Sequence, residues 1–384
     1  MTASDGPRVI RPEAFGLHVN RTEHWPDISV SAIRPANVAW RTINSAPGKF
    51  DWSQLDAWVD RAAKEKSEIG YVFLGTPQWA ASRPSESCYA GPIGCASVPR
   101  EWLDWEAFVT AVVERYRGKI KSYELWNEPN DPQFWTGSIE QMVELTNRAG
   151  KIIRSLDPAA TIVSPSPTYV KAGPPQIWLK EFLAAGGGKY AQVIGFHGYV
   201  GARAESVVSV VLGVQAAARE AGFADTPIWN TESSWGRDSS IEKAADQQAF
   251  LVRSYVLQLS LGVERFYWYQ WDNPNWGTLW DTTSGMRTPG QSFQTVRSWL
   301  EAAEFTQPCA EISPKHWECS LTRGSAPFKI SWNEATASTE CFLTTIEQPA
   351  AQPPAAEIKK ECLGGTPFSG SDQKQFGHAA IIGH

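Results

Sequence analysis

Short apolar runs rich in β-forming residues alternate with longer amphipathic stretches along most of this chain. Such alternation is typical of parallel βα units. The eight candidate strands are Ala14–Asn20, Asn37–Ile43, Ile69–Leu74, Ser122–Asn127, Thr161–Ser164, Val193–Tyr199, Pro227–Glu232 and Arg265–Tyr269. Eight strands with helical patterns between them suit a closed (β/α)8 (TIM) barrel, an α/β fold that we predict for residues 10–304.

The intervening helices show the 3.6-residue periodicity of amphipathic helices. Residues Trp102–Tyr116, for example, place Trp105 and Phe108 on the same face. The predicted helices are Asp51–Lys64, Trp102–Tyr116, Ile139–Leu156 and Ala245–Leu261. From about Phe305 this periodicity fades and short strand-like runs follow. We therefore predict a small β-rich accessory domain over residues 305–384, C-terminal to the barrel.

The six cysteines fall in three close pairs, which are Cys88 with Cys95, Cys309 with Cys319, and Cys341 with Cys362. An even number at short separations predicts disulfides and an oxidising compartment, although six reduced, buried thiols are the alternative. The chain begins MTASDGPRVI, with no basic region followed by an apolar one, so a secretory signal is not expected within it. The cysteines nevertheless favour a secreted or periplasmic location over a cytoplasmic one.

Charge and composition exclude several classes of protein. The net charge of -6, with no run of lysine or arginine, argues against nucleic-acid binding. No apolar stretch approaches the length of a membrane span. No CxxC motif or HxH pattern is present, so we expect no metal and no cofactor. The sequence leaves the oligomeric state open.

One motif carries the strongest chemical signal. Residues 123–130 read Tyr-Glu-Leu-Trp-Asn-Glu-Pro-Asn, a strand-like run that stops at Pro129. Asn127 and Glu128 are therefore expected at the carboxyl end of the fourth strand, the face on which barrel active sites lie. The segment resembles the acid/base signature of clan A glycoside hydrolases, which implies that Glu128 is the general acid/base. Glu124, within the same strand, is the weaker candidate for that role.

A glycosidase needs a second carboxylate. Glu232 ends the run 227–232, three strands after Glu128, and therefore falls on the seventh strand. The clan places its nucleophile there, so the resemblance implies that Glu232 is the nucleophile of a retaining double displacement.

Further residues at strand ends are candidate substrate-binding groups. Asn127 is expected to bind the sugar 2-hydroxyl, and Arg41, at the end of the second predicted strand, to keep Glu232 ionised. Tyr199 or His197 is expected to hydrogen-bond the nucleophile, as a residue of the sixth strand does in the clan. His18 is a weaker candidate for a hydroxyl contact.

The chain has 19 tryptophans, and several lie near predicted strand ends beside Asn, Asp and Glu. Flat indole rings match the apolar faces of pyranoses. We predict that Trp271 floors the subsite of the cleaved sugar, and that Trp79, Trp235 and Trp280 also bind substrate. Core packing is the alternative for each of them.

Over residues 15–299 the chain resembles glycoside hydrolase family thirty-nine. The resemblance rests on Phe15-Gly16-Leu17-His18, Phe50-Asp51-Trp52, Gly75-Thr76-Pro77 with Trp79, the segment 124–130, and Thr231-Glu232. Residues 233–236, Ser-Ser-Trp-Gly, depart from the β-xylosidase pattern, so the resemblance favours the bacterial exopolysaccharide hydrolases. It implies endo-acting cleavage of a polysaccharide or oligosaccharide. The alternatives are an exo-acting glycosidase of the same clan and a catalytically inactive carbohydrate-binding barrel.

Overall fold

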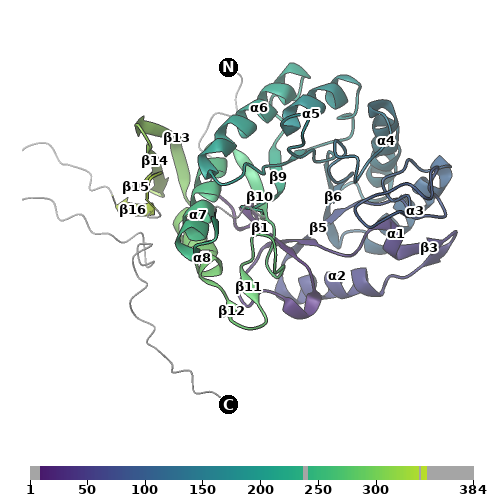
Figure 1. Cartoon of the computed structure of the whole chain (residues 1–384), viewed down its shortest axis with the longest axis horizontal. Helices are drawn as coiled ribbons and strands as arrows, with labels where there is room; N and C mark the ends of the chain where they lie inside the picture. The colour runs from purple at the N-terminus through teal and green to yellow at the C-terminus, as the bar shows by residue number, and fades with distance from the viewer. Residues whose placement is uncertain (1–8, 237–240, 337–338, 344–384) are drawn as a thin grey trace, which may run out of the picture.

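The computed structural model describes residues 9–236, 241–336 and 339–343, and the structural statements below concern these residues. Its central sheet is wholly parallel and is ordered β7-β6-β5-β2-β1-β10-β9-β8. A parallel bridge between Val163 and Val193 joins the two ends of this order and closes the barrel. The barrel strands are β1 (Phe15–Val19), β2 (Ala32–Pro35), β5 (Glu68–Val72), β6 (Ile120–Glu124), β7 (Thr161–Val163), β8 (Ile194–His197), β9 (Ile228–Ser233) and β10 (Val263–Trp268). The predicted (β/α)8 barrel is confirmed (Figure 1).

Helices surround these strands (Figure 1). The longer ones are α2 (Ser53–Glu65), α3 (Trp102–Tyr116), α4 (Ile139–Leu156), α5 (Pro175–Ala184), α6 (Val207–Glu220), α7 (Ala244–Ser260) and α8 (Thr288–Leu300). The short elements are α1 (Trp40–Ile43), η1 (Pro12–Ala14), η2 (Thr22–His24), η3 (Ala204–Ser206), the β3 (Asn44–Ala46)–β4 (Lys49–Phe50) hairpin, and the β11 (Trp280–Asp281)–β12 (Gly285–Met286) hairpin. None of the described helices combines the length and apolarity that a bilayer crossing requires.

Local sequence explains where the helices begin and which face they bury. The bounds of α3 and α4 agree with those predicted from periodicity, because each helix buries one apolar stripe against the barrel. Helix α4 starts at a capping box, in which the Ser138 hydroxyl accepts from the Gln141 N–H and the Gln141 side chain accepts from the Ser138 N–H.

One glycine position shows how the barrel interior is filled. The Tyr267 ring points inward at the level of β1, and a Cβ at Gly16 would lie 2.4 Å from its Cδ1 atom. Any side chain at position 16 would therefore displace the ring. Tyr267 is buried, so this close approach packs the barrel below the catalytic face.

The second barrel strand is not where the sequence pattern placed it. The predicted strand Asn37–Ile43 is wrong, because Asn37 has a φ of 63° and Trp40–Ile43 is the short helix α1. The strand is Ala32–Pro35 instead. It is only four residues long, ends in proline and contains a buried arginine, Arg34, so it lacks the apolar run that marks the other strands.

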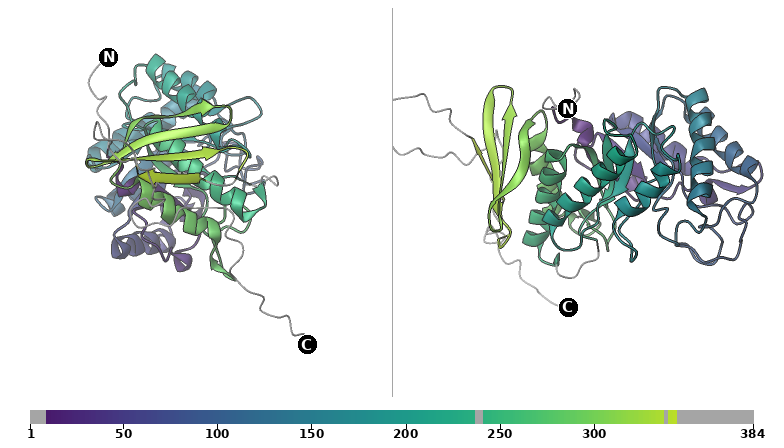
Figure 2. Two further views of the ribbon diagram at one scale, coloured as in Figure 1. Left: turned by 90° about the vertical axis from the view of Figure 1, so that its left-hand side faces the viewer. Right: turned by 90° about the horizontal axis from the view of Figure 1, so that it is seen from above.

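Beyond α8, four antiparallel strands form a second sheet, β13 (Glu304–Ser313), β14 (His316–Arg323), β15 (Ala326–Asn333) and β16 (Thr339–Leu343). This sheet lies over α7 and α8 (Figure 2). Trp317 and Trp332 stack across it with ring centroids 6.0 Å apart, and the Trp332 indole N–H donates to Glu205 in η3. Helix α7, covered on both sides, is buried over residues 247–260. The predicted β-rich C-terminal region is thus present, while the division at residue 305 remains a prediction.

Two of the three predicted disulfides are confirmed. Cys88–Cys95 closes the loop between β5 and α3, and Cys309–Cys319 links β13 to β14. The third predicted pair, Cys341 with Cys362, lies outside the residues whose side chains are described. Closing a seven-residue separation removes chain entropy worth about 2–3 kcal/mol from the unfolded state.

Candidate active site

Two carboxylates meet at the carboxyl-terminal mouth of the barrel. Glu128 follows β6, the fourth barrel strand, and Glu232 lies on β9, the seventh. A carboxylate oxygen of each, together with a ring nitrogen of His197, lie within 4.8 Å of one another. The parallel strands bring these side chains together because residues at equivalent ends of a closed barrel face the same mouth.

Glu232 is held by donors on both of its oxygens. Arg34 Nη1 lies 3.0 Å from Oε2, and the Tyr199 hydroxyl donates to Oε1 at 3.0 Å. Asn230, two residues earlier on β9, accepts the Glu232 backbone N–H through its side-chain oxygen, which fixes the strand end. The carboxylate therefore has one orientation, with both hydrogen bonds favouring its charged form.

Glu128 is positioned by its backbone as well as its side chain. Its φ of 44° lies in the left-handed region, which costs a non-glycine residue about 1–3 kcal/mol and recurs at active sites. The Glu128 N–H donates to the Ser166 carbonyl at 3.0 Å. Its Oε1 atom lies 2.8 Å from His197 Nδ1, a hydrogen bond that fixes the direction of the side chain.

Burial shifts the pKa values of the ionisable side chains at the site. Removal from water raises the pKa of Glu232 above the usual value, and the nearby Glu128 adds to the effect, whereas His197, Arg34 and the Tyr199 hydroxyl oppose it. Burial also lowers the pKa of His18, and the charge of Arg34 lowers it further, so His18 is a neutral imidazole. Against its own burial, Glu124 and Glu232 raise the pKa of Arg34, which remains a fixed cation.

Arg34 is the residue that sequence reasoning missed. It bridges Glu232, Glu124 and Asn127, with Nε and Nη2 donating to Glu124 at 2.8 and 3.1 Å and Nη2 donating to Asn127 Oδ1 at 2.8 Å. The role predicted for Arg41 is wrong. Arg41 lies in α1, and its Nε donates to the Tyr89 hydroxyl instead. The sequence signal that could have identified Arg34 is a single arginine flanked by apolar residues in the short run Ala32-Ile33-Arg34-Pro35.

Glu124 forms part of the polar layer beneath the two carboxylates. Besides Arg34, it accepts from the Thr231 hydroxyl at 3.0 Å. It is buried, and both of its carboxylate oxygens accept hydrogen bonds, so its contribution is to hold Arg34 beneath Glu232. Asn127 belongs to the same network, because its Oδ1 accepts from Arg34, which fixes the orientation of the side-chain amide.

The end of the sixth strand, β8, carries His197 and is followed by Tyr199, and the first strand, β1, carries His18. These three side chains have different hydrogen-bond partners. Tyr199 contacts Glu232, whereas His197 contacts Glu128. His18 is buried, and its Nε2–H donates to the Thr231 carbonyl at 2.7 Å, 3.9 Å from a Glu232 oxygen. The Nε2 proton of His18 therefore already has an acceptor within the protein. The contact predicted between His18 and a sugar hydroxyl stays a prediction.

Of the two aromatic residues that follow strand β10, Tyr269 is partly exposed beside Glu232 and Trp271 is not exposed. Trp271 is fully buried, with its backbone N–H donating to the His18 carbonyl, so the prediction that it stacks on the cleaved sugar is wrong. Tyr269, at the end of β10, is half-buried, and its ring lies 4.9 Å from that of His18. Burial and the charge of Glu232 raise the pKa of the Tyr269 phenol. Residues past a strand end no longer follow its alternation, which explains the error.

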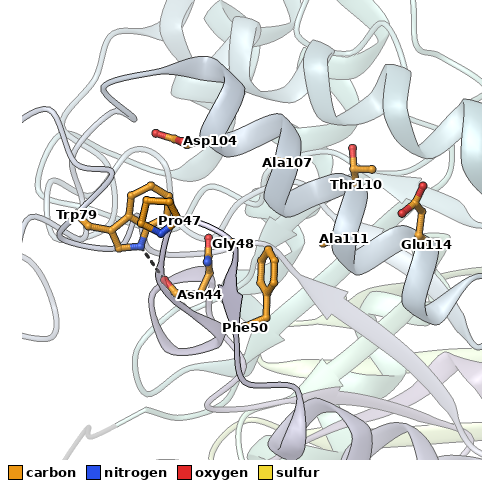
Figure 3. A pocket seen from close by; sticks show the side chains of 10 residues that line it. All are labelled: Asn44, Pro47, Gly48, Phe50, Trp79, Asp104, Ala107, Thr110, Ala111 and Glu114. Atoms are coloured by element: carbon orange, nitrogen blue, oxygen red, sulfur yellow. Dashed lines mark hydrogen bonds between the residues drawn. The ribbon is translucent and has the colours of Figure 1, made fainter.

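The other predicted tryptophans lie in three different environments. Trp235 is buried and packs against Trp268 at 5.1 Å, so its assignment to substrate binding is wrong. Trp280 is half-buried and lies 4.7 Å from the His24 ring, and its contact with substrate remains a prediction. Trp79 lines a separate pocket on the barrel flank, where its indole N–H donates to the Asn44 carbonyl at 2.8 Å (Figure 3).

Glu128, His197 and Glu232 are also the described residues whose donor atoms converge closely enough to hold a metal ion. Arg34, however, places a permanent positive charge 3.0 Å from Glu232. A metal ion bound by Glu232 would face that charge directly. The electrostatics therefore favour proton transfer and nucleophilic chemistry at this mouth.

A (β/α)8 barrel with two carboxylates facing each other at the ends of strands four and seven has the architecture of a glycoside hydrolase. Residues 62–293 match the family model described as the glycosyl hydrolase catalytic core. This match spans more than half of the chain, which therefore belongs to that family. No curated protein sequence matches the chain.

Solved structures show the same fold. A family 39 glycoside hydrolase from Bacteroides cellulosilyticus superposes with a TM-score of 0.71 at 18% identity, covering 88% of this chain and 74% of its own. A GH39 β-xylosidase from Caulobacter crescentus gives 0.63 at 17%, covering 85% and 79%. A family 51 α-L-arabinofuranosidase from Bifidobacterium longum gives 0.62 at 12%, covering 86% and 84%. These neighbours agree with the resemblance to family thirty-nine, while the exopolysaccharide branch stays a prediction.

Proposed function

We propose that this glycoside hydrolase is a retaining, endo-acting enzyme with Glu232 as nucleophile and Glu128 as general acid/base. The observation that carries the proposal is the close approach of two differently supported carboxylates. Retaining enzymes hold the two carboxyl groups about 5–5.5 Å apart, whereas inverting enzymes need about 6.5–9.5 Å to admit a water molecule. Oxygens of Glu128 and Glu232 lie within 4.8 Å, which supports retention.

The partners of each carboxylate support the assignment of roles. A nucleophile must be ionised, and Glu232 receives hydrogen bonds from Arg34 and Tyr199 that favour the ionised form. A general acid must gain and lose a proton. Glu128 is paired with His197 through a 2.8 Å contact, and among the described residues no arginine hydrogen-bonds to it, so it lacks the fixed cationic donor that Glu232 has.

The reaction follows from this arrangement. The Glu232 carboxylate attacks the anomeric carbon while the bond to the leaving oxygen breaks and the Glu128 proton moves to that oxygen. In the second step the Glu128 carboxylate takes a proton from water, whose oxygen displaces Glu232 and restores both groups. The amide N–H of Asn127 would bind the sugar 2-hydroxyl, and Tyr269 would lie under the sugar ring.

The substrate is proposed to be a polysaccharide or oligosaccharide, cleaved in an oxidising compartment. The two disulfides support action outside the cytoplasm, in the periplasm or after secretion. Endo cleavage rests on the sequence resemblance to exopolysaccharide hydrolases. It is tested by comparing the fall in viscosity of a polysaccharide with the release of reducing ends, since an exo-acting enzyme releases ends without an early loss of viscosity.

Azide rescue separates the two glutamates. In Glu128→Ala, an aryl glycoside with an acidic phenol should still form the glycosyl-enzyme, because that phenol leaves without protonation. The intermediate should then accumulate, and added azide should restore turnover with a glycosyl azide of unchanged anomeric configuration. In Glu232→Ala, azide should instead give the inverted product.

If Glu128→Ala gave the inverted glycosyl azide and Glu232→Ala the one of unchanged configuration, then Glu128 would be the nucleophile and Glu232 the general acid/base. Glu232→Gln serves as the control, because an amide cannot attack the anomeric carbon and also blocks azide from the space. It should be inactive on every substrate, with or without azide. Activity in this variant comparable to that of the parent would overturn the proposal.

A further inference from the structure

A second pocket lies on the flank of the barrel, between helix α3 and the β3–β4 hairpin (Figure 3). We call it the flank pocket. Its volume of about 390 Å³ lies within the range of small-molecule sites, about 300–1,000 Å³. None of its lining residues is among those that hydrogen-bond to Glu128 or Glu232. It is therefore a feature separate from the catalytic mouth.

Aromatic rings form one side of the flank pocket, and both are held in place. The Trp79 indole N–H is anchored to the Asn44 carbonyl at 2.8 Å, so the ring cannot turn without losing that bond. Phe50 stacks on Trp52, with centroids 5.0 Å apart and planes 17° from parallel. Trp79 and Phe50 are only half-buried, which leaves part of each ring open to a ligand. The pocket therefore offers preformed flat apolar surfaces.

Helix α3 forms the opposite side with one face of its surface. Asp104, Ala107, Ala111 and Glu114 recur at helical spacing, and all of them line the pocket. The two alanines in the middle leave room, and a carboxylate stands at each end (Figure 3). Small residues between two acceptor groups make a shallow trough facing the rings.

The polar groups of the flank pocket define the chemistry of its ligand. Asp104 and Glu114 only accept hydrogen bonds when ionised. The Trp79 N–H and the Asn44 amide N–H groups already donate within the protein, so Thr110 is the side chain left to donate. No lysine, arginine or histidine is present among the described lining residues. A ligand must therefore bring several O–H donors and an apolar C–H face, and must not be an anion. A neutral sugar has these properties, whereas a uronic acid would be repelled.

We propose that the flank pocket is a second carbohydrate-binding site, which holds a neutral sugar segment of the polysaccharide away from the catalytic mouth. This inference rests on the proposed function, because it takes the chain to meet polysaccharide. Binding at a distance from the dyad would keep the enzyme on a long chain between cleavages without contributing to the chemistry of short substrates.

Filling the pocket tests the proposal without removing any existing contact. Ala107 is exposed on α3, and Ala57 is an exposed alanine on α2 that does not line the pocket. Ala107→Trp and the matched control Ala57→Trp are made in a Glu232→Gln background, which prevents cleavage. Affinity electrophoresis then measures association with xylan and mixed-linkage β-glucan as neutral probes, and with polygalacturonate as an anionic one.

Ala107→Trp should weaken association with at least one neutral polysaccharide by about fivefold or more, and Ala57→Trp should not. Glu114→Ala, which removes an exposed acceptor and leaves packing intact, should weaken it as well. With Glu232 intact, Ala107→Trp should leave kcat/KM for an aryl glycoside unchanged. These results would support a binding site that is independent of catalysis.

The inference is overturned if neither neutral polysaccharide retards the parent, or if Ala107→Trp and Glu114→Ala bind as the parent does. Retention of polygalacturonate that is lost in Ala107→Trp would equally overturn the assigned ligand. Failure of the proposed function looks different. The enzyme with Glu232 intact would then hydrolyse no glycoside, while retention and its loss in Ala107→Trp could still be observed.

Discussion

Replacing Glu232 by glutamine should stabilise the protein at neutral pH while abolishing its activity. The carboxylate is buried in the mouth of the barrel, with 14% of its side chain exposed, and burial raises its pKa above that of a glutamate in the unfolded chain. Glutamine has the same shape and no charge. Arg34 keeps its two hydrogen bonds to Glu124 in the variant, so no buried cation loses all of its carboxylate partners.

The sign follows from proton linkage. Below the pKa of the unfolded chain, Glu232 is protonated in both states and its charge costs nothing. As the pH rises through the higher pKa of the folded state, ionisation inside the barrel costs about 1.4 kcal/mol for each pH unit by which that pKa is raised. The advantage of Glu232→Gln should therefore appear between the two pKa values, reach its full size at neutral pH, and vanish in acid.

Thermal unfolding between pH 4 and pH 8 measures this effect. For a protein of this size, each kcal/mol should raise Tm by only about 1 °C, so the melting temperatures must be compared with replicate precision below that value. Glu23→Gln, at an exposed position, is the matched control and should leave Tm unchanged across the range. A variant Glu232→Gln that melts below the parent at pH 7, by a deficit that shrinks as the pH falls toward 4, would refute the reasoning. It would mean that the ion pair with Arg34 outweighs burial.

Two further predictions concern residues around the dyad. Arg34→Lys keeps the positive charge, but a lysine cannot contact Glu232, Glu124 and Asn127 together. The kcat on an aryl glycoside should therefore fall about a hundredfold. A fall of less than threefold would contradict this prediction. Tyr269→Ala should lower kcat/KM with little change in Tm, whereas Trp271→Ala should cost about 3–5 kcal/mol of stability, measured by denaturant unfolding. The reverse pattern would restore Trp271 as the floor of the sugar subsite.

The sequence was sufficient to predict those parts of the fold in which a periodic pattern decides the structure. Helices α3 and α4 bury one apolar stripe each, and their bounds were predicted correctly for that reason. The motif at residues 123–130 located the fourth strand, although β6 ends at Glu124 and not at the predicted Asn127, which makes only an isolated bridge to Ser166. Strand β2 could not be found in this way, since its buried charge is stabilised by partners from β6 and β9 that are distant in sequence.

The candidate site was predictable to a similar extent. Glu128 and Glu232 could be located because Glu128 lies shortly after one recognisable strand, β6, and Glu232 lies near the end of another, β9. Whether an aromatic residue faces the mouth or the core depends on the path of the chain after the strand, as Trp271 and Tyr269 show. Composition favoured tryptophan as the sugar platform, and only packing distinguishes the buried ring from the accessible one.

The burial of helix α7 on every side has a consequence for how this enzyme can be divided. In most barrels the outer face of such a helix meets water, but here Trp317, Phe328 and Trp332 of the C-terminal sheet join the same hydrophobic core as the barrel strands. A fragment ending at residue 304 would expose the outer surface of α7 to solvent and would leave Glu205 without its contact to Trp332. The sheet is therefore part of what keeps the barrel folded, and truncation there should yield an aggregation-prone chain rather than a minimal enzyme.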